Sequence, residues 1–177
     1  MHYCRAKYSN WLYSLSTRSP YYTSASEYLL PKQNGNILNT KARIKAELIA
    51  PCGMNCAICM GHLLRDENIC PGCRGDDAYK PGNCVRCVIV NCDYFENTDS
   101  KYCSEKCDEF PCRRLKSLDK RYRTKYDMSM LENLENIEEL GIRAFVRNEK
   151  VRWTCPECGG LICVHRGSCS KCGKDKH

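Results

Sequence analysis

Cysteine spacing constrains the fold of this chain more than any other feature of its sequence. Two quartets of cysteines share the spacing C-x2-C-x10-C-x2-C. The first quartet is Cys56, Cys59, Cys70 and Cys73, and the second is Cys155, Cys158, Cys169 and Cys172. The sulfurs of a C-x2-C pair converge on one point, and two such pairs match the tetrahedral coordination that zinc prefers. The repeated spacing is therefore typical of zinc ribbons.

The composition favours metal over disulfides as the source of stability. The chain has 17 cysteines in 177 residues and few long aliphatic runs, so we expect no single large hydrophobic core. An odd number of cysteines argues against a closed set of bridges. We find no apolar secretory segment at the N-terminus and no run of the length that a membrane span needs. These observations disfavour the alternative, a small secreted disulfide protein.

The central segment carries most of the predicted metal ligands. It holds eleven cysteines and one histidine, His62, and twelve ligands would complete three four-coordinate sites. We expect the cysteines to bind metal, and we interpret His62 as a surface residue and Cys163 and His165, further along the chain, as packing residues. The predicted ligands of the segment are Cys52, Cys56, Cys59, Cys70, Cys73, Cys84, Cys87, Cys92, Cys103, Cys107 and Cys112.

An iron–sulfur cluster is the alternative to zinc in this segment. Cys52, Cys56 and Cys59 are spaced C-x3-C-x2-C, as in radical S-adenosylmethionine enzymes. Those enzymes place the loop after the first strand of a barrel of about 200 residues. The 118 residues after Cys59 hold further cysteines and helices instead, so we set the radical enzyme aside. A cluster outside that fold stays open, because a thiolate triad with a remote fourth cysteine is a common cluster pattern.

The second quartet predicts a zinc ribbon at the end of the chain. Gly159, Gly160 and Gly173 follow its two cysteine pairs and can take the positive φ of a metal-binding turn. Ten residues between the pairs suffice for a β-hairpin, here Leu161 to Arg166 with the turn at Gly167. We expect one zinc ion in this ribbon.

Amphipathic helices are expected between the two cysteine-rich regions. The segment 113–125 places Leu115, Leu118 and Tyr122 on one face and is otherwise rich in Lys and Arg. A capping box, Ser129 with Glu132, begins a second helix. That helix stops at a glycine, residue 141, and a third helix runs from there to about residue 153.

Charge is unevenly distributed along the chain, whose net charge is +7. Residues 46–112 carry 6 basic and 11 acidic side chains, so the cysteine-rich segment is acidic. The flanks are basic, with 7 and 1 in residues 1–45, 10 and 7 in 113–150, and 5 and 2 in 151–177. Asp119 interrupts the basic run of the first helix, which favours a solvated face packed near the acidic segment over a surface for phosphates.

The order of the cysteine motifs resembles that of a known family. APCGMNCAIC, CPGC, CVRCVIVNC and CDEFPCRRL follow one another and precede RWTCPECGGLICVHRGSCSKCG. This order resembles the family known as domain of unknown function 3795, which comprises cysteine-rich prokaryotic proteins, many from anaerobes and archaea. The resemblance covers about residues 46–172 and implies metal binding and a cytoplasmic setting, without an activity. The chain departs from it at Cys103 and Cys107, which are three residues apart where the resemblance leads us to expect two.

The domain organisation follows from these patterns. We predict a small metal-stabilised α+β protein with a poorly ordered extension (1–44), a loop-rich cysteine-cluster core (45–112), amphipathic helices (113–153) and a C-terminal zinc ribbon (154–177). Glycine and proline are frequent in the core and leave room for one short helix, from about Ala57 to Arg65.

The expected role is recognition rather than catalysis. No Ser-His-Asp set, phosphate loop or H-E-x-x-H motif is present. We expect a cytoplasmic zinc-binding protein whose partner is a protein or a nucleic acid, with no membrane contact. The alternative is an iron–sulfur protein in redox or cluster handling, with the core cysteines as ligands.

Overall fold

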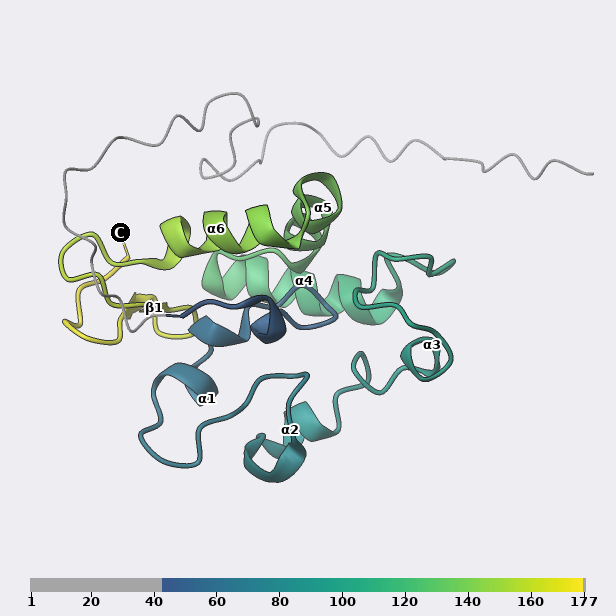
Figure 1. Cartoon of the computed structure of the whole chain (residues 1–177), viewed down its shortest axis with the longest axis horizontal. Helices are drawn as coiled ribbons and strands as arrows, with labels where there is room; N and C mark the ends of the chain where they lie inside the picture. The colour runs from purple at the N-terminus through teal and green to yellow at the C-terminus, as the bar shows by residue number, and fades with distance from the viewer. Residues whose placement is uncertain (1–42, 177) are drawn as a thin grey trace, which may run out of the picture. The chain divides into compact units, whose positions relative to one another are not determined.

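The computed structural model of the chain describes residues 43–176 (Figure 1). The extension predicted over residues 1–44, including Cys4, lies outside the described residues except for Arg43 and Ile44. Ile44 is 1% exposed and is already part of the hydrophobic core. None of the helices in the described range has both the length and the apolar character needed to cross a bilayer.

Three helices follow the cysteine-rich segment, as predicted. They are α4 (Arg113–Tyr126), α5 (Met130–Leu140) and α6 (Ile142–Trp153). The predicted capping box begins α5, where the Ser129 hydroxyl accepts a hydrogen bond of 3.0 Å from the Glu132 N–H. Gly141 separates α5 from α6 at φ 76°. Helix α5 packs against both α4 and α6 (Figure 1).

The hydrophobic core lies where these helices meet the loops. Leu115, Leu134, Phe145 and Trp153 are fully buried and come from all three helices. The loops contribute apolar side chains to the same cluster, including Ile49, Ile58 and Val164. The helices thus form one wall against which the cysteine-bearing loops are packed.

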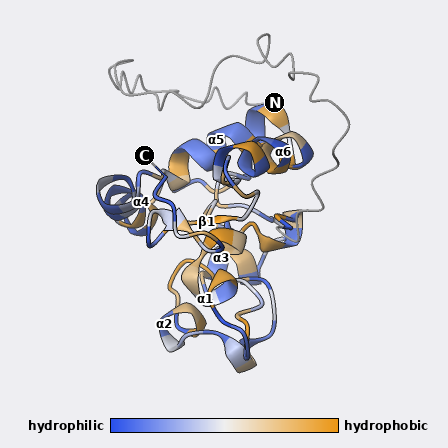
Figure 2. Ribbon diagram, turned by 90° about the vertical axis from the view of Figure 1, so that its left-hand side faces the viewer, coloured by the Kyte–Doolittle hydropathy of each residue, from blue (hydrophilic) through white to orange (hydrophobic). Residues whose placement is uncertain are grey.

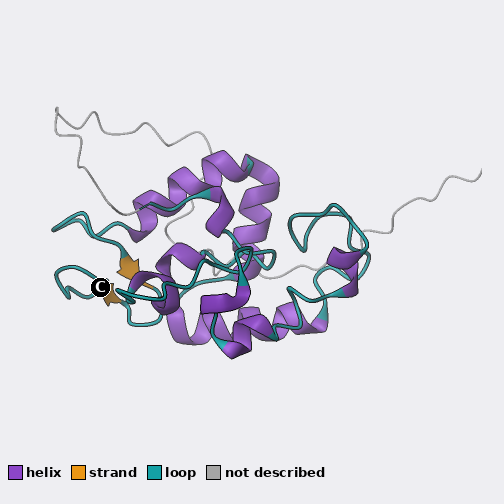
Figure 3. Cartoon of the chain, turned by 60° about the horizontal axis from the view of Figure 1, so that its bottom comes forward, coloured by secondary structure: helices purple, strands orange, loops and turns teal. Residues whose placement is uncertain are grey.

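The cysteine-rich segment is built of loops and single turns (Figure 3). Its short elements are η1 (Ala46–Leu48), η2 (Cys56–Ile58), α1 (Met60–Leu63), η3 (Asp77–Tyr79), α2 (Gly82–Val85) and α3 (Asp93–Glu96), where η denotes a 3-10 helix. The predicted helix from Ala57 to Arg65 is shorter and divided. Cys59 is extended, with φ −74° and ψ 141°, and separates η2 from α1.

A two-stranded hairpin follows α6. Strands β1 (Ile162–Cys163) and β2 (Ser168–Cys169) are antiparallel, with Ile162 opposite Cys169. The turn is at Gly167 as predicted, with φ 67°. The Val164 N–H, just after β1, donates to the Ile58 carbonyl at 3.0 Å and joins the hairpin to the first cysteine loop.

Candidate metal centres

Four cysteines near the end of the chain bring their sulfur atoms together. Cys155 and Cys158 lie in the turn after α6, Cys169 ends β2, and Cys172 lies in the next turn. Their four sulfurs are all within 4.8 Å of one another.

The separations within this quartet suit a single metal ion. The Cys155 and Cys172 sulfurs are 3.7 Å apart, and those of Cys158 and Cys169 are 3.5 Å apart. A zinc–sulfur bond of about 2.3 Å in tetrahedral geometry places thiolates about 3.8 Å apart. The four thiols can therefore hold one tetrahedral ion without rearrangement of the backbone.

The two turns of the quartet have the same backbone design. The Gly159 N–H donates to the Cys155 carbonyl at 2.9 Å, and the Gly173 N–H donates to the Cys169 carbonyl at 3.0 Å. Both glycines have positive φ, 69° and 74°, as predicted. The left-handed conformation closes each turn and directs the two sulfurs of the pair to one side.

Gly160 has a different role from the one predicted. Its φ is not among the positive values, so backbone conformation does not require glycine there. A Cβ at this position would lie 2.8 Å from the Lys171 Cβ, 3.0 Å from the Cys169 sulfur and 3.4 Å from the Cys158 sulfur. Glycine is needed at residue 160 because the two halves of the site approach it closely.

Within this quartet the protein stabilises negative charge on Cys169, whereas the pKa of Cys172 rises to about 12, because a backbone N–H group of Lys174 that lowers it is outweighed by the neighbouring thiols of Cys158, Cys169 and Cys155. Burial opposes ionisation of Cys169, but backbone N–H groups of Cys172 and Lys171 and the Cys158 thiol lower its pKa to about 7. The Lys171 N–H lies 3.4 Å from the Cys169 sulfur. Because a thiolate is the form that binds metal, these donors favour the binding-competent state.

The first cysteine loop of the core is fixed by buried polar side chains from α5 and α6. Asn133 of α5 donates to the Gly53 carbonyl at 2.8 Å. Asn55, in the loop, donates to the Glu149 carboxylate of α6 at 2.8 Å. Asn55, Asn133 and Glu149 are all fully buried. Our sequence reasoning missed these residues, although polar side chains on the apolar faces of two helices are a signal for them.

A close thiol pair joins the first loop to the next cysteine segment. The Cys56 thiol donates to the Cys73 sulfur at 3.7 Å, which raises the pKa of Cys56 and lowers that of Cys73 to about 7. Burial opposes the lowering at Cys73, and the charges of Lys80 and Arg74 assist it. The Lys80 ammonium donates to the Cys73 carbonyl at 3.0 Å, and Arg74 donates to the Ile49 carbonyl at 2.8 Å.

The other core thiols lie close enough to influence one another. The Cys103 N–H donates to the Pro51 carbonyl at 2.9 Å, which brings the third cysteine segment to the first loop. Burial and neighbouring thiols raise the pKa of Cys84 to about 11 and that of Cys103 to about 12. The neighbours of Cys84 are Cys73, Cys59, Cys70 and Cys87, and those of Cys103 are Cys112, Cys107, Cys92 and Cys87.

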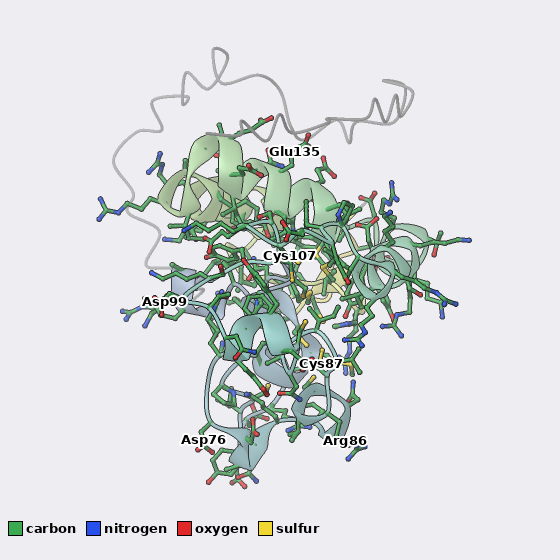
Figure 4. The ribbon with its side chains drawn as sticks, turned by 90° about the vertical axis from the view of Figure 1, so that its right-hand side faces the viewer. Asp76, Arg86, Cys87, Asp99, Cys107 and Glu135 are labelled. Carbon is green, nitrogen blue, oxygen red and sulfur yellow. The ribbon has the colours of Figure 1, made fainter. Side chains whose placement is uncertain are left out.

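The core thiols are spaced more widely than those of the tail. Within residues 43–176, the tail quartet is the one group of three or more potential ligands whose donor atoms all lie within 4.8 Å of each other. Of the first ribbon-spaced quartet, the structure brings Cys56 and Cys73 to a single-ion separation. Figure 4 shows sulfur atoms beside the labelled Cys87 and Cys107, which come from different loops. The eleven core ligands stay a prediction.

Three other side chains near the thiols have structural contacts. His62 is partly buried, and its Nδ1 lies 2.7 Å from the Cys70 carbonyl oxygen. His165 accepts a 3.4 Å hydrogen bond at Nδ1 from the Met60 N–H, and its Nε2 lies 3.0 Å from the Tyr122 hydroxyl. Cys163 is fully buried. These contacts agree with a packing role for Cys163 and His165.

All cysteines of the described range are free thiols. Compared with profiles of protein families, with curated proteins and with solved structures, the chain matches none of them.

Proposed function

We propose that this chain is a zinc-binding recognition module whose C-terminal ribbon holds one structural zinc ion. The main observation in support is that the four tail sulfurs all lie within 4.8 Å of one another. Zinc suits this set because it accepts four thiolates in tetrahedral geometry and needs no open position in a structural site. The proposed role is to fix the tail, and through it the helices, as a scaffold for a partner.

The order of the motifs supports two further parts of this proposal. We assign the chain to the family known as domain of unknown function 3795, on the ordered motifs of residues 46–172. We also place the protein in the cytoplasm, because thiolate ligands persist where the surroundings keep cysteine reduced. Neither part depends on the other.

Metal content tests the ribbon. The full chain is purified without oxygen from cells supplied with iron and zinc, beside the variants Cys172→Ser and Cys163→Ala. We expect Cys172→Ser to contain one zinc ion fewer per chain than the wild type, because it removes a ligand. Cys163→Ala removes a buried thiol outside the quartet and should keep the wild-type content. Equal zinc in the wild type and Cys172→Ser would reject the site.

A second candidate function concerns the core, where an iron–sulfur cluster is the alternative to zinc. The observation that favours it is that, within residues 43–176, no three core thiols have their sulfur atoms all within 4.8 Å of one another, as the tail thiols do. One ion holds its thiolates about 3.8 Å apart, whereas a cluster holds them further apart because each thiolate binds a different iron. Redox chemistry or cluster handling would then be the function of the core.

The absorption spectrum of the same anaerobic sample separates the two candidates for the core. Iron in the protein with a broad band near roughly 400 nm indicates a thiolate-bound cluster. A colourless protein whose metal is all zinc indicates structural ions in the core as well. The Cys172→Ser variant should leave either result for the core unchanged.

A further inference from the structure

The outward face of α4 is occupied by positive charge. Nine residues of this helix are exposed: seven are Lys or Arg, and the other two are Ser117 and Thr124. The seven cations are Arg113, Arg114, Lys116, Lys120, Arg121, Arg123 and Lys125. Figure 2 shows α4 coloured hydrophilic over most of its visible surface.

Asp119, the one acidic residue of α4, is turned away from this face. It is fully buried and accepts hydrogen bonds from the Ser129 hydroxyl at 2.7 Å and the Leu131 N–H at 3.1 Å. Its other carboxylate oxygen pairs with Arg123 at 2.8 Å. Asp119 therefore does not interrupt the basic surface, contrary to the interpretation drawn from the sequence.

Most of the α4 cations have no acidic neighbour. Among the described residues, no carboxylate lies within ion-pair distance of Arg113, Lys120, Arg121 or Lys125. The acidic core segment thus leaves these charges for an external partner. Helix α6 also carries exposed cations, but it packs beside α5, whose exposed charged residues are all acidic.

The types of side chain on this face indicate which class of partner it can bind. Its two aromatic residues, Tyr122 and Tyr126, are partly buried and pack edge-on against His165, so no ring is presented for stacking on single-stranded bases. Among the described residues, none of the exposed large apolar side chains belongs to α4. A protein interface gains most of its energy from such anchors, and membrane binding needs a buried apolar face. Phosphates require only the cations.

We propose that the outward face of α4 binds the phosphate backbone of double-helical nucleic acid. The proposal deepens the recognition role proposed above, since the metal-held loops fix the helix that carries the charges. A helix of 14 residues is about 21 Å long, and a duplex of that length carries about a dozen phosphate charges. Contacts with the phosphate backbone carry no sequence information, so we expect this binding to be independent of the duplex sequence.

The salt dependence of binding measures the number of phosphate contacts. Each contact contributes about −0.9 to the slope of log affinity against log salt for a DNA duplex. The four cations without an acidic neighbour therefore predict a slope of about −3.6 or steeper. Replacing three of them, Lys120, Arg121 and Lys125, with Gln should reduce its magnitude by about 2.7.

The test uses the full metal-loaded chain and a fluorescent 20-base-pair DNA duplex in a series of KCl concentrations, followed by anisotropy. An RNA duplex of the same length and the single DNA strand are run beside it. The triple variant Lys120→Gln, Arg121→Gln, Lys125→Gln is compared with Arg143→Gln, Arg147→Gln, Lys150→Gln, which removes three exposed cations from α6 instead. Metal content and circular dichroism of each variant are measured on the same samples.

The expected result is duplex binding with the steep slope, reduced by the α4 variant and kept by the α6 variant. Binding to both duplexes supports backbone contact. Equal losses in the two variants, tighter binding of the single strand, or displacement of the duplex by polyglutamate at equal charge would overturn the proposal. Because the metal content is measured separately, the two proposals can fail independently. A zinc-loaded wild type that does not bind the duplex rejects the α4 proposal alone. A wild type that contains no zinc rejects the ribbon alone.

Discussion

Gly160→Ala should weaken zinc binding by the tail without unfolding the protein. The added Cβ would lie 3.0 Å from the Cys169 sulfur and 3.4 Å from the Cys158 sulfur. Non-bonded heavy atoms are stable at about 3.5–4.0 Å, so the Cys169 sulfur must retreat by about 0.5 Å or more, and the Lys171 Cβ, which would lie 2.8 Å from the added atom, must move as well. Metal sites tolerate changes in ligand distance of about 0.2 Å.

The size of the effect follows from that mismatch. Changing a residue that supports a metal ligand commonly costs about 10- to 100-fold in affinity, which is about 1.4 to 2.7 kcal/mol. We expect a loss in this range for Gly160→Ala. The matched control is Gly167→Ala, in the turn of the same hairpin, where a Cβ meets nothing within 4 Å. Its positive φ costs about 1 kcal/mol of folding stability and leaves the sulfurs in place.

The assay is competition for zinc between the protein and a chromophoric chelator, with Cys172→Ser defining the signal from a chain without the tail site. Circular dichroism confirms that each variant is folded. Wild-type zinc affinity in Gly160→Ala would refute the reasoning from close approach. An equal loss in Gly167→Ala would show that turn stability, rather than contact with the sulfurs, governs binding.

Three more changes test the packing and the thiols of the core. Gly53→Ala should lower the free energy of unfolding by about 2–4 kcal/mol in chemical denaturation, because φ is 84° and the Cβ would lie 2.7 Å from the Met130 carbonyl; a smaller change would indicate a yielding loop. Ser129→Ala should cost about 1–3 kcal/mol by removing the α5 cap and a donor to buried Asp119, and Ser129→Thr should restore most of it. In the metal-free reduced chain, iodoacetamide should modify Cys73 first among the core thiols. The rate should rise through about pH 7, because the lowered pKa of Cys73 makes the thiolate abundant there. Peptide mass spectrometry measures the order of labelling, and slower labelling of Cys73 than of its neighbours contradicts the expectation.

Features encoded by neighbouring residues could be predicted from the sequence. The tail quartet is one, because its two pairs and their glycines lie within 20 residues. The Ser129 cap and the Gly141 stop are others, since each depends on a single turn of chain. The break at Cys59, between η2 and α1, could not be predicted, because no proline or glycine at this residue marks its extended conformation.

Long-range contacts account for what the sequence did not reveal. Asp119 looked like a break in a basic run, and its burial depends on Ser129 and Leu131 in the next helix. One of the hydrogen bonds that fix the first cysteine loop joins Asn55 to Glu149, which are 94 residues apart. The sequence around each residue does not identify such pairs. Several polar residues of a helix could each form a buried hydrogen bond, and only the tertiary structure determines which one has a partner.

The hydrogen bond from Val164 to Ile58 has a consequence for the proposed binding of metal. It makes the hairpin of the tail and the first cysteine loop of the core neighbours in one backbone network, one residue away from Cys163 and Cys59. Whatever metal orders one of these segments lowers the entropy that must be lost when the other binds. We therefore expect metal bound at one segment to raise the affinity of the other for its metal, so that the core of Cys172→Ser still fills when metal is abundant but loses its metal to a weaker chelator than the wild type does.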